Sequence, residues 1–132
     1  MVRRRTGSGS CDHVLENFDR SICAPDLLLT EVSGAIVRRA NSDKGFADDA
    51  RSALERVMLF WDHGGIALHR LTTDRVARAA RIALELGHPL ADCVYLSLAI
   101  ELDCDLATCD AKSHAKSAGR YPGTRMLAEY GR

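Results

Sequence analysis

The chain has 132 residues, of which 46% are hydrophobic and 27% charged, a composition that suits one globular domain with its own core and excludes a disordered chain. The formal net charge is zero, so the protein does not hold nucleic acid by bulk charge, although basic clusters occur at residues 3–5 and 38–39. Because no apolar run approaches the ~20 residues of a membrane span, and the chain shows no secretory signal, we expect a cytoplasmic protein without a membrane partner.

The chain contains five cysteines, several of them within apolar runs: Cys11, Cys23, Cys93, Cys104 and Cys109. The odd number favours reduced thiols over a disulfide framework. Cys104, Cys109 and His114 match no common zinc spacing, and they lack a fourth ligand. We therefore expect all five thiols to be reduced and none to bind zinc.

The first ten residues, MVRRRTGSGS, differ from the rest of the chain. They are basic and then rich in glycine and serine, without periodicity, which is the composition of a tail or linker. We expect residues 1–10 to form a flexible or aberrant segment, and residues 11–132 to form the domain.

From Cys11 onward, helical and strand-like apolar patterns alternate. The spacing predicts helices over 11–18, 26–40, 46–62, 73–86, 88–105 and 111–119. Short apolar runs predict strands over 21–24, 66–71, 106–108 and 124–127. Pro25 suits the first residue of a helix, and Gly87 suits the residue that follows one. This alternation predicts an α/β fold, a three-layer α/β/α sandwich around a parallel sheet, whose site lies beyond the carboxyl ends of its strands.

Three acidic residues occupy positions where a carboxylate is unexpected. Glu31 lies on or beside the apolar stripe of its helix, although a boundary glutamate could extend to solvent. Asp92 flanks a buried face, although aspartate also favours the first turn of a helix. Asp110 follows the strand 106–108, although aspartate is common in turns.

These three acids can converge at one edge of an α/β sheet. Three adjacent carboxylates repel each other, so a cation or protons must neutralise them. Oxygen ligands suit Mg²⁺ or Mn²⁺, and such ions serve phosphoryl transfer by activating a water molecule. The sequence therefore predicts a metal site formed by Glu31, Asp92 and Asp110.

Three stretches carry a resemblance to the PIN-domain family, in particular to the VapC-type toxin ribonucleases of bacterial toxin–antitoxin pairs: APDLLLTEV (24–32), HPLADCVYLSLA (88–99) and LATCD (106–110). The resemblance covers about residues 11–127. It implies an Mg²⁺-dependent endoribonuclease in which Glu31, Asp92 and Asp110 hold the ion and Thr108 supports the acids. It also implies an RNA substrate, a small antitoxin partner and a homodimer.

The chain departs from the family at its start, because nothing matches the family's opening hydrophobic strand and its aspartate. We therefore expect an N-terminally incomplete PIN-like domain with weakened catalysis. Two interpretations remain open. The chain is a metal-dependent endoribonuclease, or it is an inactive module that binds an antitoxin or dimerises.

Overall fold

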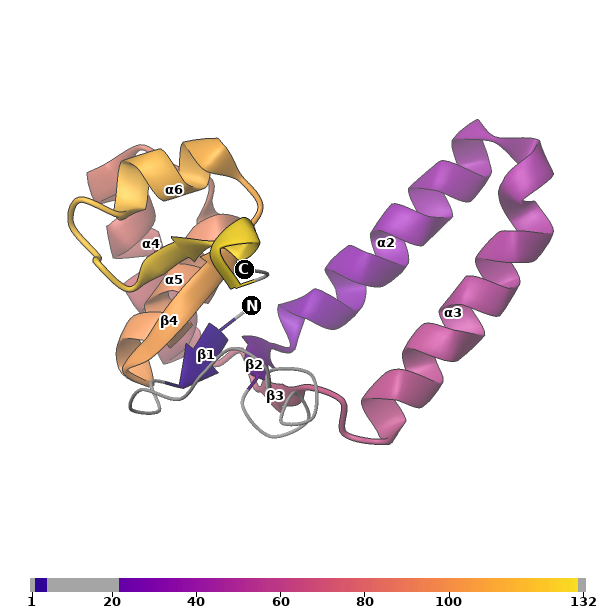
Figure 1. Cartoon of the computed structure of the whole chain (residues 1–132), viewed down its shortest axis with the longest axis horizontal. Helices are drawn as coiled ribbons and strands as arrows, with labels where there is room; N and C mark the ends of the chain where they lie inside the picture. Colours follow the sequence, from indigo (N-terminus) through magenta and orange to yellow (C-terminus); the bar gives the residue numbers. More distant parts are fainter. Residues whose placement is uncertain (1, 5–21, 131–132) are drawn as a thin grey trace.

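The computed structural model describes residues 2–4 and 22–130, which form a mixed α/β protein (Figure 1). The strands are β1 (Val2–Arg4), β2 (Ile22–Pro25), β3 (Ala67–His69), β4 (Cys104–Thr108) and β5 (Thr124–Met126). The helices in this part of the chain are α2 (Leu27–Ser42), α3 (Ala47–Asp62), α4 (Thr73–Leu86), α5 (Leu90–Glu101) and α6 (Ala111–Ser117), with short 3₁₀ turns η2 (Lys44–Phe46) and η3 (Leu127–Tyr130). The helix predicted over 11–18 lies outside the described residues.

The five strands form one sheet in the order β3-β2-β1-β4-β5. β2 and β3 are parallel, as are β4 and β5, but β1 lies between these pairs and is antiparallel to both of its neighbours. The sheet is therefore mixed, in contrast to the wholly parallel sheet that the sequence predicts. The central strand comes from the basic segment at residues 1–10, of which residues 1 and 5–10 lie outside the described part.

The start of α2 differs from the prediction in one respect. Pro25 is the last residue of β2, where it pairs with His69, and α2 begins at Leu27. Asp26 stands between them, and its backbone N–H donates to the His69 carbonyl at 2.9 Å. The Asp26 carboxylate accepts a hydrogen bond from the Leu71 N–H at 3.0 Å. Asp26 therefore joins the carboxyl ends of β2 and β3, a constraint from residues more than 40 positions away that no helix-start rule contains.

The helix predicted over 88–105 is shorter in the structure. α5 ends at Glu101, and β4 begins at Cys104. Between them, Asp103 has a φ of 50°, a left-handed conformation that stops a helix. A short apolar run such as this one fits a buried strand and a helix end equally well, so periodicity alone extends the helix too far.

The core forms where α5 lies against the sheet. α5 packs on β4, β2 and β1, and it also packs against α4. The first buried cluster joins residues of α5 to residues of the strands: Cys23, Leu96, Leu98, Ala99, Cys104 and Leu106. α5 buries residues on several of its faces, as expected for a helix that is covered by other elements. Its packing therefore positions Asp92, which lies in its first turn.

No disulfide joins Cys23, Cys93, Cys104 or Cys109 to another described residue, and the reduced state of all five cysteines stays a prediction. Cys23, Cys93 and Cys104 are buried as small core residues, whereas Cys109 is exposed. Burial raises the pKa of the Cys93 thiol, which keeps it protonated and unreactive. Cys11 lies outside the described residues.

α2 and α3 pair with each other and extend away from the sheet as an arm (Figure 1). α2 has no buried residue, and α3 buries only Ala50. Large apolar side chains are exposed on this α2–α3 arm: Val37, Met58, Leu59 and Phe60. The apolar stripe predicted over 46–62 is thus only partly covered by α2. Among the described residues, no helix has the length and apolarity needed to cross a membrane.

Candidate functional site

Asp110 stands two residues past the carboxyl end of β4, where it begins α6. One carboxylate oxygen, Oδ1, accepts hydrogen bonds from the backbone N–H groups of Lys112 at 2.8 Å and Ser113 at 3.3 Å. These two bonds are the main reason why the pKa of Asp110 is lowered, with smaller contributions from the charges of His88 and Lys112. The carboxylate is therefore anionic at neutral pH, and its second oxygen accepts no hydrogen bond from residues 2–4 or 22–130.

Asp92 lies in the first turn of α5, and its side chain is 43% exposed. Its Oδ2 atom is 3.1 Å from Nε2 of His88, which precedes it by four residues. Ligand atoms of His88, Asp92 and Asp110 all lie within 4.8 Å of one another. The structure therefore brings together two of the three acids predicted from the sequence, and it adds a histidine to them.

Glu31 is not a member of this group of ligand atoms, although it lies nearby on α2. Its Oε2 atom accepts a hydrogen bond from the Tyr95 hydroxyl at 2.5 Å. Tyr95 follows Asp92 by three residues, so it occupies the next turn on the same side of α5. Burial, and then the hydrogen bond to Glu31, raise the pKa of Tyr95. Glu31 is thus connected to the site through a neutral tyrosine.

Thr108 ends β4, and its hydroxyl accepts a hydrogen bond from the backbone N–H of Asp110 at 3.0 Å. The bond holds the turn that aims Asp110 at Asp92. A pocket of about 230 Å³ opens beside these residues, and Asp92, Tyr95, Thr108 and Ser113 contribute to its lining. Carboxylate and hydroxyl groups therefore lie on the wall of this pocket.

α6 adds positive charge next to the acids. Lys112 and Lys116 are both exposed and are separated by one helical turn. The Lys116 ammonium donates to the Gly87 carbonyl at 2.6 Å, which ties α6 to the turn between α4 and α5. A basic rim beside two carboxylates can contact a phosphate backbone while the acids hold a cation.

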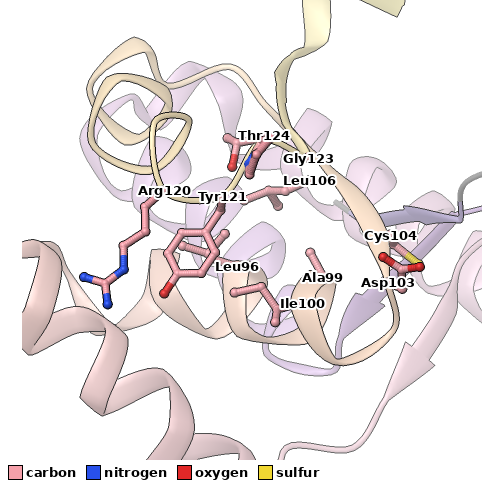
Figure 2. Close-up of a pocket in the computed structure, with 11 residues that line it drawn as sticks. Leu96, Ala99, Ile100, Asp103, Cys104, Leu106, Arg120, Tyr121, Gly123 and Thr124 are labelled. Atoms are coloured by element: carbon pink, nitrogen blue, oxygen red, sulfur yellow. The ribbon is translucent and has the colours of Figure 1, made fainter.

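A second pocket, of about 180 Å³, lies where α5 and β4 approach the loop before β5 (Figure 2). Asp103 is the one acid in its lining, and Tyr121 forms part of its wall. Thr124 also lines this pocket, and its buried hydroxyl oxygen has no hydrogen-bond partner in the described part of the chain. With a single acid, this pocket lacks the donors of a metal site.

Sequence reasoning missed His88 and Tyr95. Both lie in the stretch that contains Asp92, at positions i−4 and i+3 from it. On a continuous helix this spacing would place all three side chains on one face. That spacing was present in the sequence. However, Pro89 indicates that the helix begins after His88, so the spacing alone does not predict that His88 and Asp92 lie on the same side.

We expect Tyr95→Phe to lower the free energy of unfolding by about 1 to 3 kcal/mol, the usual cost of losing a hydrogen bond to a charged acceptor. The change removes the hydroxyl that binds Glu31 and leaves a partly buried carboxylate without its donor. Urea denaturation followed by circular dichroism measures the loss. Tyr121→Phe is the control, because no hydrogen bond of the Tyr121 hydroxyl occurs among the described residues. Equal stability of both variants would show that the Tyr95–Glu31 bond contributes nothing.

The fold and the site together define a mixed α/β protein with a carboxylate and imidazole cluster at one end of its sheet. Comparisons with protein-family models, with curated proteins and with solved structures find no match to this chain.

Proposed function

We propose that this chain is a metal-dependent endoribonuclease of the PIN type, with the three-layer sandwich that this family implies. One observation carries the proposal. Asp92 and Asp110 are distant in sequence, and they meet with His88 so closely that their ligand atoms lie within 4.8 Å. Residues 24–32, 88–99 and 106–110 resemble the PIN-domain family, and this resemblance implies that the same two aspartates are metal ligands.

The donor set fits a divalent cation. Asp110 uses one oxygen for the helix N-terminus and keeps the other, and the half-exposed Asp92 leaves room for water around an ion. Asp92 and Asp110 would hold Mg²⁺ or Mn²⁺, and Glu31 would keep its hydrogen bond to Tyr95. When bound, such an ion supplies an activated water molecule and stabilises negative charge on the leaving oxygen.

The chain's own residues bind and orient the substrate. Lys112 and Lys116 attract the RNA backbone, whose phosphates give most of the affinity in such complexes. Thr108 holds the Asp110 turn in place through its hydroxyl. Hydrolysis adds water across one phosphorus–oxygen bond, so hydroxyl joins phosphorus and the proton goes to the leaving oxygen.

A second candidate function is binding without catalysis. The exposed apolar residues of the α2–α3 arm favour it, because such surfaces mark interaction sites. A small antitoxin or a second copy of the chain would cover the arm. This function and catalysis are compatible, because the arm and the aspartate cluster are formed by different residues.

The deciding experiment incubates the purified chain with labelled single-stranded RNA in Mg²⁺ or Mn²⁺. We expect slow cleavage, because the site offers two aspartates, and we expect EDTA to stop it and added metal to restore it. Sites of cleavage are read on a sequencing gel. A folded chain that cuts no RNA under any of these conditions would refute the enzyme. In that case, a stable dimer in size-exclusion chromatography with light scattering would favour the binding module.

A further inference from the structure

The His88 side chain is buried although it faces two carboxylates. It is 7% exposed, and its Nε2 atom has no hydrogen-bond partner in the described part of the chain. Nε2 lies 3.1 Å from Asp92 Oδ2, but without the geometry of a hydrogen bond. A buried polar atom without a partner costs free energy, and native proteins rarely keep one. The atom points into the Asp92–Asp110 cluster, where a cation would satisfy it.

We propose that His88 Nε2, together with one oxygen each of Asp92 and Asp110, forms an inner-sphere site for a divalent transition-metal ion, Zn²⁺ or Mn²⁺, in preference to Mg²⁺. The inference rests on the proposed function in taking the same two aspartates as ligands, and it names the class of metal. Imidazole nitrogen is a good ligand for transition metals, whereas Mg²⁺ prefers oxygen ligands. Glu31 remains bound to Tyr95 and is not a ligand.

The geometry is close to that of a formed site. With metal–ligand bonds of about 2.1 Å, neighbouring ligands lie roughly 3.0 to 3.4 Å apart and opposite ligands about 4.2 Å apart. The separation of 3.1 Å between Nε2 and Asp92 Oδ2 matches neighbouring ligands. A separation of 4.8 Å, the upper limit in the group, must shorten by about 0.6 Å for opposite ligands of an octahedral ion and by about 1.4 Å for ligands of a tetrahedral ion.

The backbone holds His88 in place before any ion binds. Gly87 ends α4 in a left-handed conformation, with a φ of 57°. The His88 N–H then donates to the Ala83 carbonyl at 3.1 Å, and Lys116 holds the Gly87 carbonyl. A ligand fixed in this way loses little conformational entropy on binding, and such preorganisation strengthens a site.

The test measures metal binding without RNA. Titration calorimetry with Zn²⁺, Mn²⁺ and Mg²⁺ gives the three affinities, and we expect Mg²⁺ to bind at least ~10-fold more weakly than the other two ions. His88→Gln should reduce transition-metal affinity at least ~10-fold and change Mg²⁺ affinity little. His63→Gln is the matched control, because His63 is exposed at the end of α3. Circular dichroism checks that each variant is folded.

A spectroscopic measurement on the unmodified chain does not depend on how a variant folds. Pulsed electron paramagnetic resonance of bound Mn²⁺ should show coupling to a directly bound ¹⁴N nucleus. Absence of that coupling, or unchanged affinities in folded His88→Gln, would overturn the inference even if the chain cleaves RNA with Mg²⁺. Nitrogen-coupled Mn²⁺ in a chain that cuts no RNA would support the site and refute the proposed enzyme. A chain that binds none of the three ions would refute both.

Discussion

Asp110→Asn should abolish metal-dependent RNA cleavage while the protein stays folded. In the proposed site the Asp110 carboxylate would have two separate roles: Oδ1 accepts from the N–H groups of Lys112 and Ser113, and the other oxygen would hold the ion. Asparagine keeps an oxygen for the helix N-terminus, where it is as favourable as aspartate, but it carries no charge. Loss of an inner ligand should reduce the rate at least ~100-fold, beyond the usual effect of changing a group behind the ligands.

Cleavage rates and thermal unfolding curves of the variants separate these two roles. Asp110→Ala should lose both cleavage and stability, because alanine cannot accept from the two N–H groups. Asp103→Asn is the matched control: it makes the same change at an exposed aspartate on the other pocket, in a left-handed conformation that asparagine tolerates (Figure 2). Near-normal cleavage by Asp110→Asn would refute the assignment of Asp110 as a ligand.

Removing β1 should destabilise the whole domain. Val2–Arg4 pair with β2 on one side and β4 on the other, so deletion leaves two parallel strand pairs without the strand that joins them. Each lost ladder hydrogen bond costs about 1 kcal/mol. Several such bonds amount to a large part of the roughly 5–15 kcal/mol that stabilises a typical domain.

A chain lacking residues 1–4 is therefore expected to be unfolded, or to melt far below the full chain, in circular dichroism and urea denaturation. A point substitution tests the same strand more finely. Arg3→Pro removes a backbone N–H from a central strand, where proline is not tolerated, and Arg3→Ala keeps that N–H. We expect the proline variant to lose stability and the alanine variant to retain it. Equal stability of the shortened and full chains would show that β1 does not hold the sheet together.

The predictions from sequence succeeded where local periodicity carries the information. The helices at α2, α3 and α4 follow from apolar spacing, and Gly87 ends α4 as expected, with the left-handed backbone that glycine favours. Asp92 and Asp110 were identified because each carboxylate adjoins a buried face or strand end. The convergence was predicted for three acids, from two helix faces and one strand end, and the structure brings together only Asp92 and Asp110 of the three.

The prediction of a wholly parallel sheet was wrong because strand direction depends on partners. The segment 1–10 has the composition of a tail. Nothing in the local sequence of Val2–Arg4 indicates that this strand pairs with β2 on one side and β4 on the other. Pro25 shows the same limitation on a smaller scale. A proline at this position can begin a helix or end a strand. Pro25 ends β2 because it pairs with His69 of β3.

The sequence by itself determined where helices run and which carboxylates lie near the core, because both depend on spacing along a few turns of chain. Only the tertiary structure decided which side chains meet. It buried His88 against Asp92 and Asp110 and linked Glu31 to Tyr95 across 64 residues. The physical reason is that these contacts depend on how α5 packs against the sheet and on the direction in which α2 follows β2. Packing between segments that are distant in sequence produces no periodic pattern in the sequence of either segment.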